Sequence, residues 1–148
     1  MDAIYLNQGA ISLITAVYLI FVAMPGAAWA KRYAGVRKRR FLEIGVYLGA
    51  VALVFTLNAA NNEIAARRAD RINAAVEQFH SKTHRYPNAL SELVPEFIKR
   101  IPLAKYTLEL NSFKYIHNKT DPLLLYVAIP PFGRPTYSFA RRTWAYSD

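Results

Sequence analysis

The sequence predicts an α+β membrane protein with two transmembrane helices, the second of which continues as a long amphipathic helix packed on a small antiparallel β-meander. Three observations in the 148-residue chain lead to this class: two long uncharged apolar blocks, a one-sided apolar pattern after the second block, and alternating aromatic and aliphatic segments near the end. With about 60 residues assigned to the membrane, about 88 remain, which is too few for a large enzyme core. The chain has no cysteine, which excludes disulfides and thiol nucleophiles.

The two uncharged blocks are residues 3–30 and 44–62. Each supplies the roughly 20 residues that a helix needs to cross a bilayer. The first block has a rival interpretation as a cleaved signal peptide, because Ala28-Trp29-Ala30 resembles a cleavage site, but it is preceded by Asp2 and by no basic residue. Met24-Pro25-Gly26 predicts a kink in this first helix.

A basic segment, residues 31–40, separates the two blocks and carries six positive charges. The positive-inside rule places such a loop in the cytoplasm. Three arginines follow the second block closely, so the charge bias is six against three. We therefore expect residues 1–60 to form a two-helix anchor in a bacterial inner membrane, with the amino terminus and a domain of residues 61–148 in the periplasm.

Beyond Asn58 the apolar residues follow a helical period on one side only. This pattern predicts one helix of about 40 residues at 1.5 Å rise per residue, ending at Tyr86-Pro87. Asn88 is then expected to cap a short helix that contains Leu90 and Leu93. The predicted core stripe of the long helix consists of Ile64, Ala65, Ile72, Ala75, Val76 and Phe79.

The rest of the chain is typical of short β-strands. Four segments are expected: 106–110, 113–117, 123–129 and 135–146. Asn, Asp, Pro and Gly separate them, and such short connections imply antiparallel pairing.

Two segments give the chain a family likeness. Phe41-Leu-Glu-Ile-Gly-Val46, which follows a basic run and opens the apolar helix, and Tyr86-Pro-Asn-Ala-Leu-Ser-Glu-Leu-Val-Pro95 resemble the pseudopilins of type II secretion and the type IV pilins. The resemblance covers residues 41–146 and implies a pseudopilin-like periplasmic domain. The chain differs from the family pattern in having Arg40 where family members have Gly, and Glu43 as the third rather than the fifth residue after that position.

One group of side chains has the spacing of a metal site. Glu77, His80 and His84 lie one turn apart on the expected helix, which would suit a metal-dependent sensor or enzyme. Histidines are also common in the last turn of a helix, and Lys82 and Arg85 would repel a cation there. We therefore expect no metal and no cofactor.

No other motif predicts catalysis. Asn118-Lys-Thr-Asp121 matches the guanine-recognition motif of G proteins, but the sequence has no Gly-rich phosphate-binding loop, so this segment is expected to be a turn. No groove-reading or RNA-binding signature is present either. The sequence predicts neither an enzyme nor a nucleic-acid-binding protein.

Two features predict contacts with other proteins. Gly45 and Gly49 form a small-x-x-x-small pair that lets a second helix approach closely, either the chain's own first span or a helix of a partner. The aromatic side chains near the end exceed what a small meander needs for its core and suggest a docking patch, although an ordinary aromatic core is the alternative. This predicted patch consists of Phe132, Tyr137, Phe139, Trp144 and Tyr146.

These observations predict a non-catalytic accessory subunit of a larger inner-membrane complex, which docks on integral membrane proteins through its transmembrane helices and its periplasmic domain. The alternative is a pseudopilin-like component of a type II secretion or type IV pilus machine. Residues 61–148 carry a net charge of +5, so anionic lipids are further candidate partners.

Overall fold

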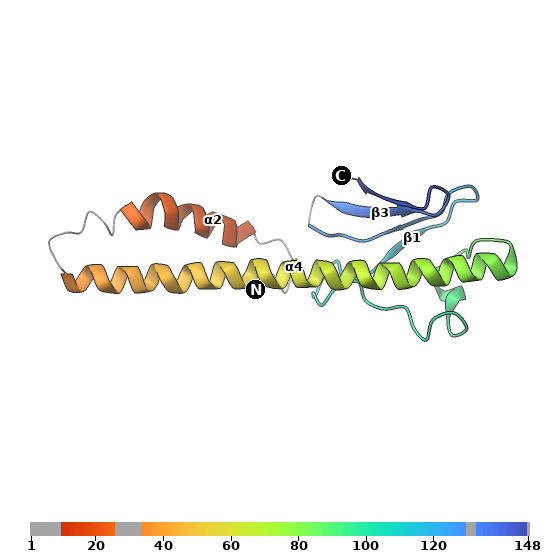
Figure 1. Ribbon diagram of the computed structural model, residues 1–148, viewed down its shortest axis with the longest axis horizontal. Helices are drawn as coiled ribbons and strands as arrows, with labels where there is room; N and C mark the ends of the chain where they lie inside the picture. Colours follow the sequence, from red (N-terminus) through yellow and green to blue (C-terminus); the bar gives the residue numbers. More distant parts are fainter. Residues whose placement is uncertain (1–9, 26–33, 130–132, 148) are drawn as a thin grey trace. The chain divides into compact units, whose positions relative to one another are not determined.

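The computed structural model describes residues 10–25, 34–129 and 133–147 (Figure 1). It confirms the α+β class, with one long helix and a four-stranded antiparallel sheet. The chain divides into two compact units, and the division falls within the long helix between Ala59 and Ala60.

The first unit begins with helix α2 (Ala10–Tyr18), which continues as the π-helical turn η1 (Leu19–Ala23). The Met24 N–H donates to the Leu19 carbonyl, five residues earlier. Pro25, the next residue, has no N–H, and its ring crowds the preceding turn, so the hydrogen-bond pattern of a regular α-helix cannot continue there. The irregular turn thus lies just before Met24-Pro25-Gly26, the segment predicted to kink. Gly26 itself lies outside the described residues.

Helix α4 (Ala34–Thr83) has 50 residues and begins earlier than predicted. The prediction of a basic loop over residues 31–40 is wrong from Ala34 onward, because these residues form the first turns of α4. Lys and Arg are good helix formers, and Arg39 pairs with Glu43 one turn later at 3.0 Å. The helix ends where predicted, since His84 adopts a left-handed φ of 56° ahead of Tyr86-Pro87.

Among the described residues, one helical stretch, Lys38–Thr83, contains a window long and apolar enough to cross a membrane by length and composition, and 11% of that window is buried. The helix before it carries only a shorter apolar stretch, Leu13–Ala23. The described residues therefore contain one candidate span, and the two-span anchor stays a prediction.

The core of the second unit forms on one side of α4. The predicted stripe is confirmed, with Ile64 half-buried at its edge and Ala69 as an addition. Small alanines at the start of the stripe leave room for close packing, and each fully buried branched side chain contributes about 1.5–3 kcal/mol. The buried helical residues are Ala65, Ala69, Ile72, Ala75, Val76 and Phe79, and they pack with Leu90, Leu93, Ala104, Leu124, Tyr126, Ala128 and Phe139.

The sheet has the order β1-β2-β3-β4, with every neighbouring pair antiparallel, as predicted. Leu124 at its centre pairs with Tyr115 on one side and with Tyr137 on the other. The strands are β1 (Lys114–Ile116), β2 (Leu123–Leu125), β3 (Arg134–Ser138) and β4 (Thr143–Ser147). The segment 135–146, predicted as a single strand, is a hairpin, because the chain turns between β3 and β4 with a φ of 51° at Arg142.

Residues 106–110, also predicted as a strand, form a compact loop instead. The Asn111 side chain donates to the Thr107 carbonyl at 2.9 Å, and the Thr107 hydroxyl donates to the Glu109 carbonyl at 2.8 Å. Leu110 has a φ of 52°. These local bonds satisfy the backbone in place of a strand ladder, as Asn and Thr side chains commonly do in turns.

The short helix η2 (Leu90–Leu93) is a 3₁₀ turn that places its two leucines in the core. The predicted capping by Asn88 is wrong, because Ala89 occupies the position before the turn. The roles are reversed: the Glu92 carboxylate accepts the Asn88 N–H at 2.9 Å.

Lys105, which precedes the compact loop, is among the largest fully buried side chains of the described residues. Its ammonium donates to the Ala128 carbonyl at 2.6 Å. Burial disfavours the charged form and lowers the pKa of Lys105 from 10.5 to about 8. Between these two values the unfolded chain therefore holds a proton that the folded chain releases.

Replacing Lys105 with Met is expected to remove a pH dependence of stability. Because the unfolded state binds more protons, the free energy of unfolding of the unsubstituted chain should rise between about pH 8 and 10, by up to about 1.4 kcal/mol per pH unit. Chemical denaturation of the full chain in detergent, followed at several pH values, measures this rise. Lys114→Met, at an exposed position, is the control and should keep it. A rise that survives Lys105→Met would contradict the assignment.

Candidate functional site

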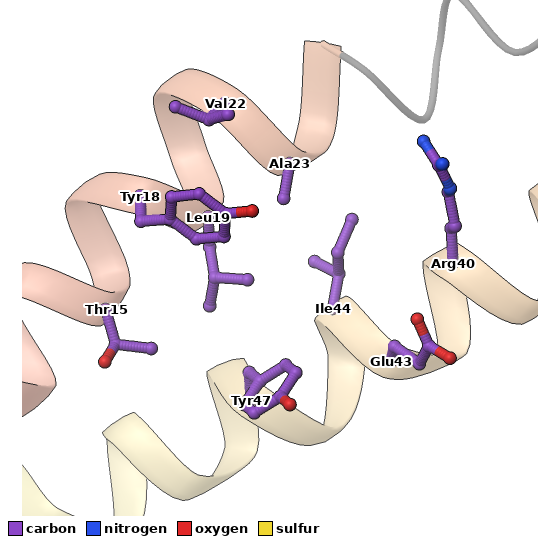
Figure 2. Close-up of a pocket in the computed structure, with 9 residues that line it drawn as sticks. All are labelled: Thr15, Tyr18, Leu19, Val22, Ala23, Arg40, Glu43, Ile44 and Tyr47. Carbon is purple, nitrogen blue, oxygen red and sulfur yellow. The ribbon is translucent and has the colours of Figure 1, made fainter.

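In the first unit, α2 and η1 contact α4 through a small apolar cluster. Leu19 and Ile44 are buried against each other, with Ala23 beside them, and Figure 2 shows the first two pointing toward one another. A pocket of about 630 Å³ lies around this contact. Its lining is mixed: Arg40 and Glu43 lie at one end, and the remaining lining includes the hydroxyl side chains of Thr15, Tyr18 and Tyr47 as well as apolar ones.

Gly45 and Gly49 do not take part in this contact. Apart from the neighbouring residues and the backbone of α4 itself, no described atom lies within 4 Å of the position that a Cβ would occupy on either glycine. On the same side, Lys38, Phe41, Leu42, Gly45 and Val46 line an open and largely apolar groove. The close-approach face is therefore left free by the described part of the first helix.

Large apolar side chains around this part of α4 are also exposed. Ile44, packed on Leu19, is buried, and Val51 and Val54 are half-buried. Water is a poor environment for such a surface, because each Å² of exposed apolar area costs about 25 cal/mol. The exposed side chains are Phe41, Leu42, Val46, Tyr47, Leu48, Leu53, Phe55 and Leu57.

The structure separates the residues of the predicted aromatic patch. Phe139 is 1% exposed and belongs to the core, so its assignment to a docking patch is wrong. Its ring packs among those of Tyr137, Tyr86 and Tyr115, with centroids 5.1, 5.8 and 6.2 Å away, and Tyr137 is half-buried. Phe132 lies outside the described residues. Trp144 and Tyr146 remain at the surface, 36% and 77% exposed.

Trp144 and Tyr146 both lie on β4, which forms one edge of the sheet. The Trp144 ring contacts the rings of Tyr137 and Tyr126, at 5.2 and 6.0 Å. These two ring contacts hold Trp144 against the protein, and Tyr146 is the more exposed of the two side chains. An edge strand also offers unpaired backbone groups to a partner.

The three candidate metal ligands are not brought together. His84 lies beyond the end of α4, His80 stacks on Tyr86 with ring centroids 4.2 Å apart, and Glu77 pairs with Arg142 at 3.7 Å. Among the described residues, no group of three His, Cys, Asp or Glu side chains could hold a metal ion.

The Asn118–Asp121 segment forms a turn, as expected, and Asp121 has a structural role in it. Its carboxylate accepts bonds from the Ser138 hydroxyl at 2.8 Å and from the Ala140 N–H at 3.1 Å. These bonds hold the pKa of Asp121 below its usual value. The turn thereby links the β1–β2 connection to the β3–β4 hairpin.

A cationic cleft in the second unit was not predicted from the sequence. It has a volume of about 500 Å³, and Arg68, Arg71, Lys99 and Arg100 are among its lining residues, none of which is acidic. In the described part of the chain, none of these four cations lies within 4.0 Å of a carboxylate. The two pairs are about 30 residues apart in the sequence, so only the fold brings them together.

Comparisons with protein-family models, with curated proteins and with solved structures gave no match to this chain. The likeness to pseudopilins over residues 41–146 thus stays a prediction from the sequence.

The different positions of the core and surface aromatic side chains predict different effects on the free energy of unfolding. Phe139→Ala is expected to lower the free energy of unfolding by about 3–5 kcal/mol, since it removes a buried ring. Tyr146→Ala should change it by less than about 0.5 kcal/mol, because the ring is exposed. Chemical denaturation of the full chain in detergent gives both values. Equal losses for the two variants would refute the division.

Proposed function

We propose that this chain is a non-catalytic accessory subunit of a larger bacterial inner-membrane protein complex. The observation that carries the proposal is the free apolar surface of α4 between Phe41 and Leu57, in which Gly45 and Gly49 leave a face open for close approach. Residues 44–62 carry no charge, so this part of the helix suits a lipid environment.

A lipid environment explains why the apolar side chains of α4 are exposed, but it does not explain why two glycines lie on one face of the helix. Between helices in a membrane, association depends on close van der Waals packing, which small residues at the interface allow. Gly also weakens a helix by about 1 kcal/mol relative to Ala in water, so two glycines one turn apart have a cost that a packing partner offsets. A transmembrane helix of a partner protein is the occupant that fits this face.

The second unit provides another contact surface at the edge of its sheet. Trp144 and Tyr146 are aromatic groups of the kind enriched at protein interfaces, and they lie on the exposed edge strand β4. In the proposed topology the basic first turns of α4 stay in the cytoplasm and the second unit faces the periplasm.

We propose no catalytic step for this chain. The carboxylates with an unusual environment serve the fold: Glu77 pairs with Arg142, Glu92 pairs with Arg85 at 2.8 Å, and Asp121 holds two turns together. General acid–base catalysis needs such groups free at a cavity.

Substituting both glycines tests the helix contact. Gly45→Leu/Gly49→Leu fills the open face and is expected to lower the amount of partner recovered in mild detergent at least about tenfold, equivalent to about 1.4 kcal/mol. Quantitative mass spectrometry of the purified complex measures this.

The matched control is Ala50→Leu, which adds bulk to an exposed residue about 100° around the helix from Gly49. It should leave recovery unchanged. A chain that purifies without any stoichiometric partner before substitution would overturn the proposal.

The alternative function is a component of a type II secretion or type IV pilus machine. One observation favours it: a long helix that is apolar in its first half and packs an amphipathic second half with a four-stranded antiparallel sheet. This function requires cleavage between Arg40 and Phe41. Intact-mass measurement of the membrane-extracted protein decides, because a mass that includes residues 1–40 excludes a processed pseudopilin.

A further inference from the structure

One arginine of the cationic cleft connects its two walls. The Arg68 guanidinium donates to the Leu103 carbonyl at 2.8 Å, donates to the Tyr106 hydroxyl and lies 4.3 Å from the centre of the Tyr106 ring. The Tyr106 N–H in turn donates to the Asn61 side chain at 3.3 Å. Arg68 thus fixes the loop against α4 and leaves the other three cations free to bind.

Arg71, Lys99 and Arg100 are exposed around this fixed centre. Three like charges in one small cleft repel each other, and in the described structure no carboxylate within ion-pair distance offsets that repulsion. An anion bound in the cleft would offset this repulsion. Arginine forms paired hydrogen bonds with phosphate oxygens, and lysine adds a mobile point charge.

The same cleft also has exposed apolar and aromatic lining residues, which are called its rim below. Ile101, Leu103 and Tyr106 line it and are all exposed. A soluble anion such as free phosphate gains nothing from apolar side chains. A phospholipid does, because its phosphate lies directly next to glycerol and acyl chains, and tyrosine is enriched at that depth of a membrane.

The position in the sequence agrees with this occupant. Arg68 and Arg71 follow Asn62, the last residue of the uncharged block, by six and nine residues. A basic group that closely follows a membrane span lies where lipid headgroups begin. Arg67, by contrast, pairs with Glu63 at 3.0 Å and is not part of the cleft.

We infer that the cleft formed by Arg68, Arg71, Lys99 and Arg100 binds the phosphate of an anionic phospholipid headgroup, with Ile101, Leu103 and Tyr106 in contact with the membrane interface. The inference rests on the proposed membrane anchoring and adds a specific lipid site to it. It goes beyond a general attraction of basic residues to lipid, because one fixed arginine and an apolar rim define the site.

The absence of cysteine allows a site-specific test with the full chain. A polarity-sensitive fluorophore on Leu103→Cys reports whether the rim meets lipid, and the same label on Ala140→Cys, an exposed residue of the β3–β4 turn, is the control position. Each labelled chain is placed in nanodiscs of phosphatidylcholine alone or with phosphatidylglycerol. A blue shift at position 103 is expected only with phosphatidylglycerol. It should fade as ionic strength rises from about 0.1 to 1 M, which shortens the screening length from about 10 to 3 Å.

Charge-matched variants show whether the cleft is responsible. Lys99→Gln/Arg100→Gln should abolish most of the shift, whereas Lys114→Gln/Lys119→Gln removes the same charge from the exposed β1 and β1–β2 region and should keep it. Equal effects of the two pairs, or the same shift in both kinds of nanodisc, would overturn the inference. In the latter case the residue at position 103 meets lipid without any dependence on headgroup charge, so the cations of the cleft do not select an anionic headgroup. A shift produced by soluble glycerophosphate in phosphatidylcholine discs would also overturn it.

Failure of the membrane anchoring would look different. A chain that does not incorporate into either kind of nanodisc would refute the proposed anchoring, whereas a chain that incorporates but shows no lipid-dependent shift refutes only the lipid site.

Discussion

Packing of the α4 stripe against the sheet is the contact on which the second unit depends. Strands of three to five residues form a marginal sheet by themselves, because each supplies few ladder hydrogen bonds and little buried area. The helix provides the missing apolar surface. Leu124, Tyr126 and Phe139 are buried in one cluster with Ile72, Val76 and Phe79, so neither layer would retain its core without the other.

The first part of α4 obeys a different constraint. Its apolar residues surround the helix rather than forming one stripe, and 11% of the most apolar window is buried. In water, such a helix would gain little free energy on folding because its apolar side chains stay exposed. In lipid, its backbone hydrogen bonds are satisfied within the helix and its apolar side chains lie in an apolar environment. One continuous helix thus carries two kinds of surface, each suited to a different environment.

Periodicity predicted the elements that depend on burial. The stripe from Ala65 to Phe79 and the central strand at Leu124 follow from apolar spacing, and both are confirmed. The errors occur where local hydrogen bonds decide. Residues 106–110 alternate like a strand, but Asn111 and Thr107 bond the backbone locally, and in residues 135–146 a tight turn at Arg142 was hidden in a continuous β-like pattern.

The surfaces were harder to predict than the core. Gly45 and Gly49 could be found from spacing, but whether they face the first helix depends on rotation about the α4 axis, which sequence does not determine. The prediction that Phe139 belongs to the aromatic patch was wrong for a related reason. The alternation of residues along a strand does not tell which side chains near a hairpin turn face the core. The cleft depends on a contact between Arg68 and Leu103, 35 residues apart. A second contact lies close by. Lys105, between Leu103 and Tyr106, is buried and donates to the Ala128 carbonyl. Lys105 is buried while Leu103 and Tyr106 on either side of it are exposed, so the exposed side chains of the cleft lie next to a fixed point of the fold.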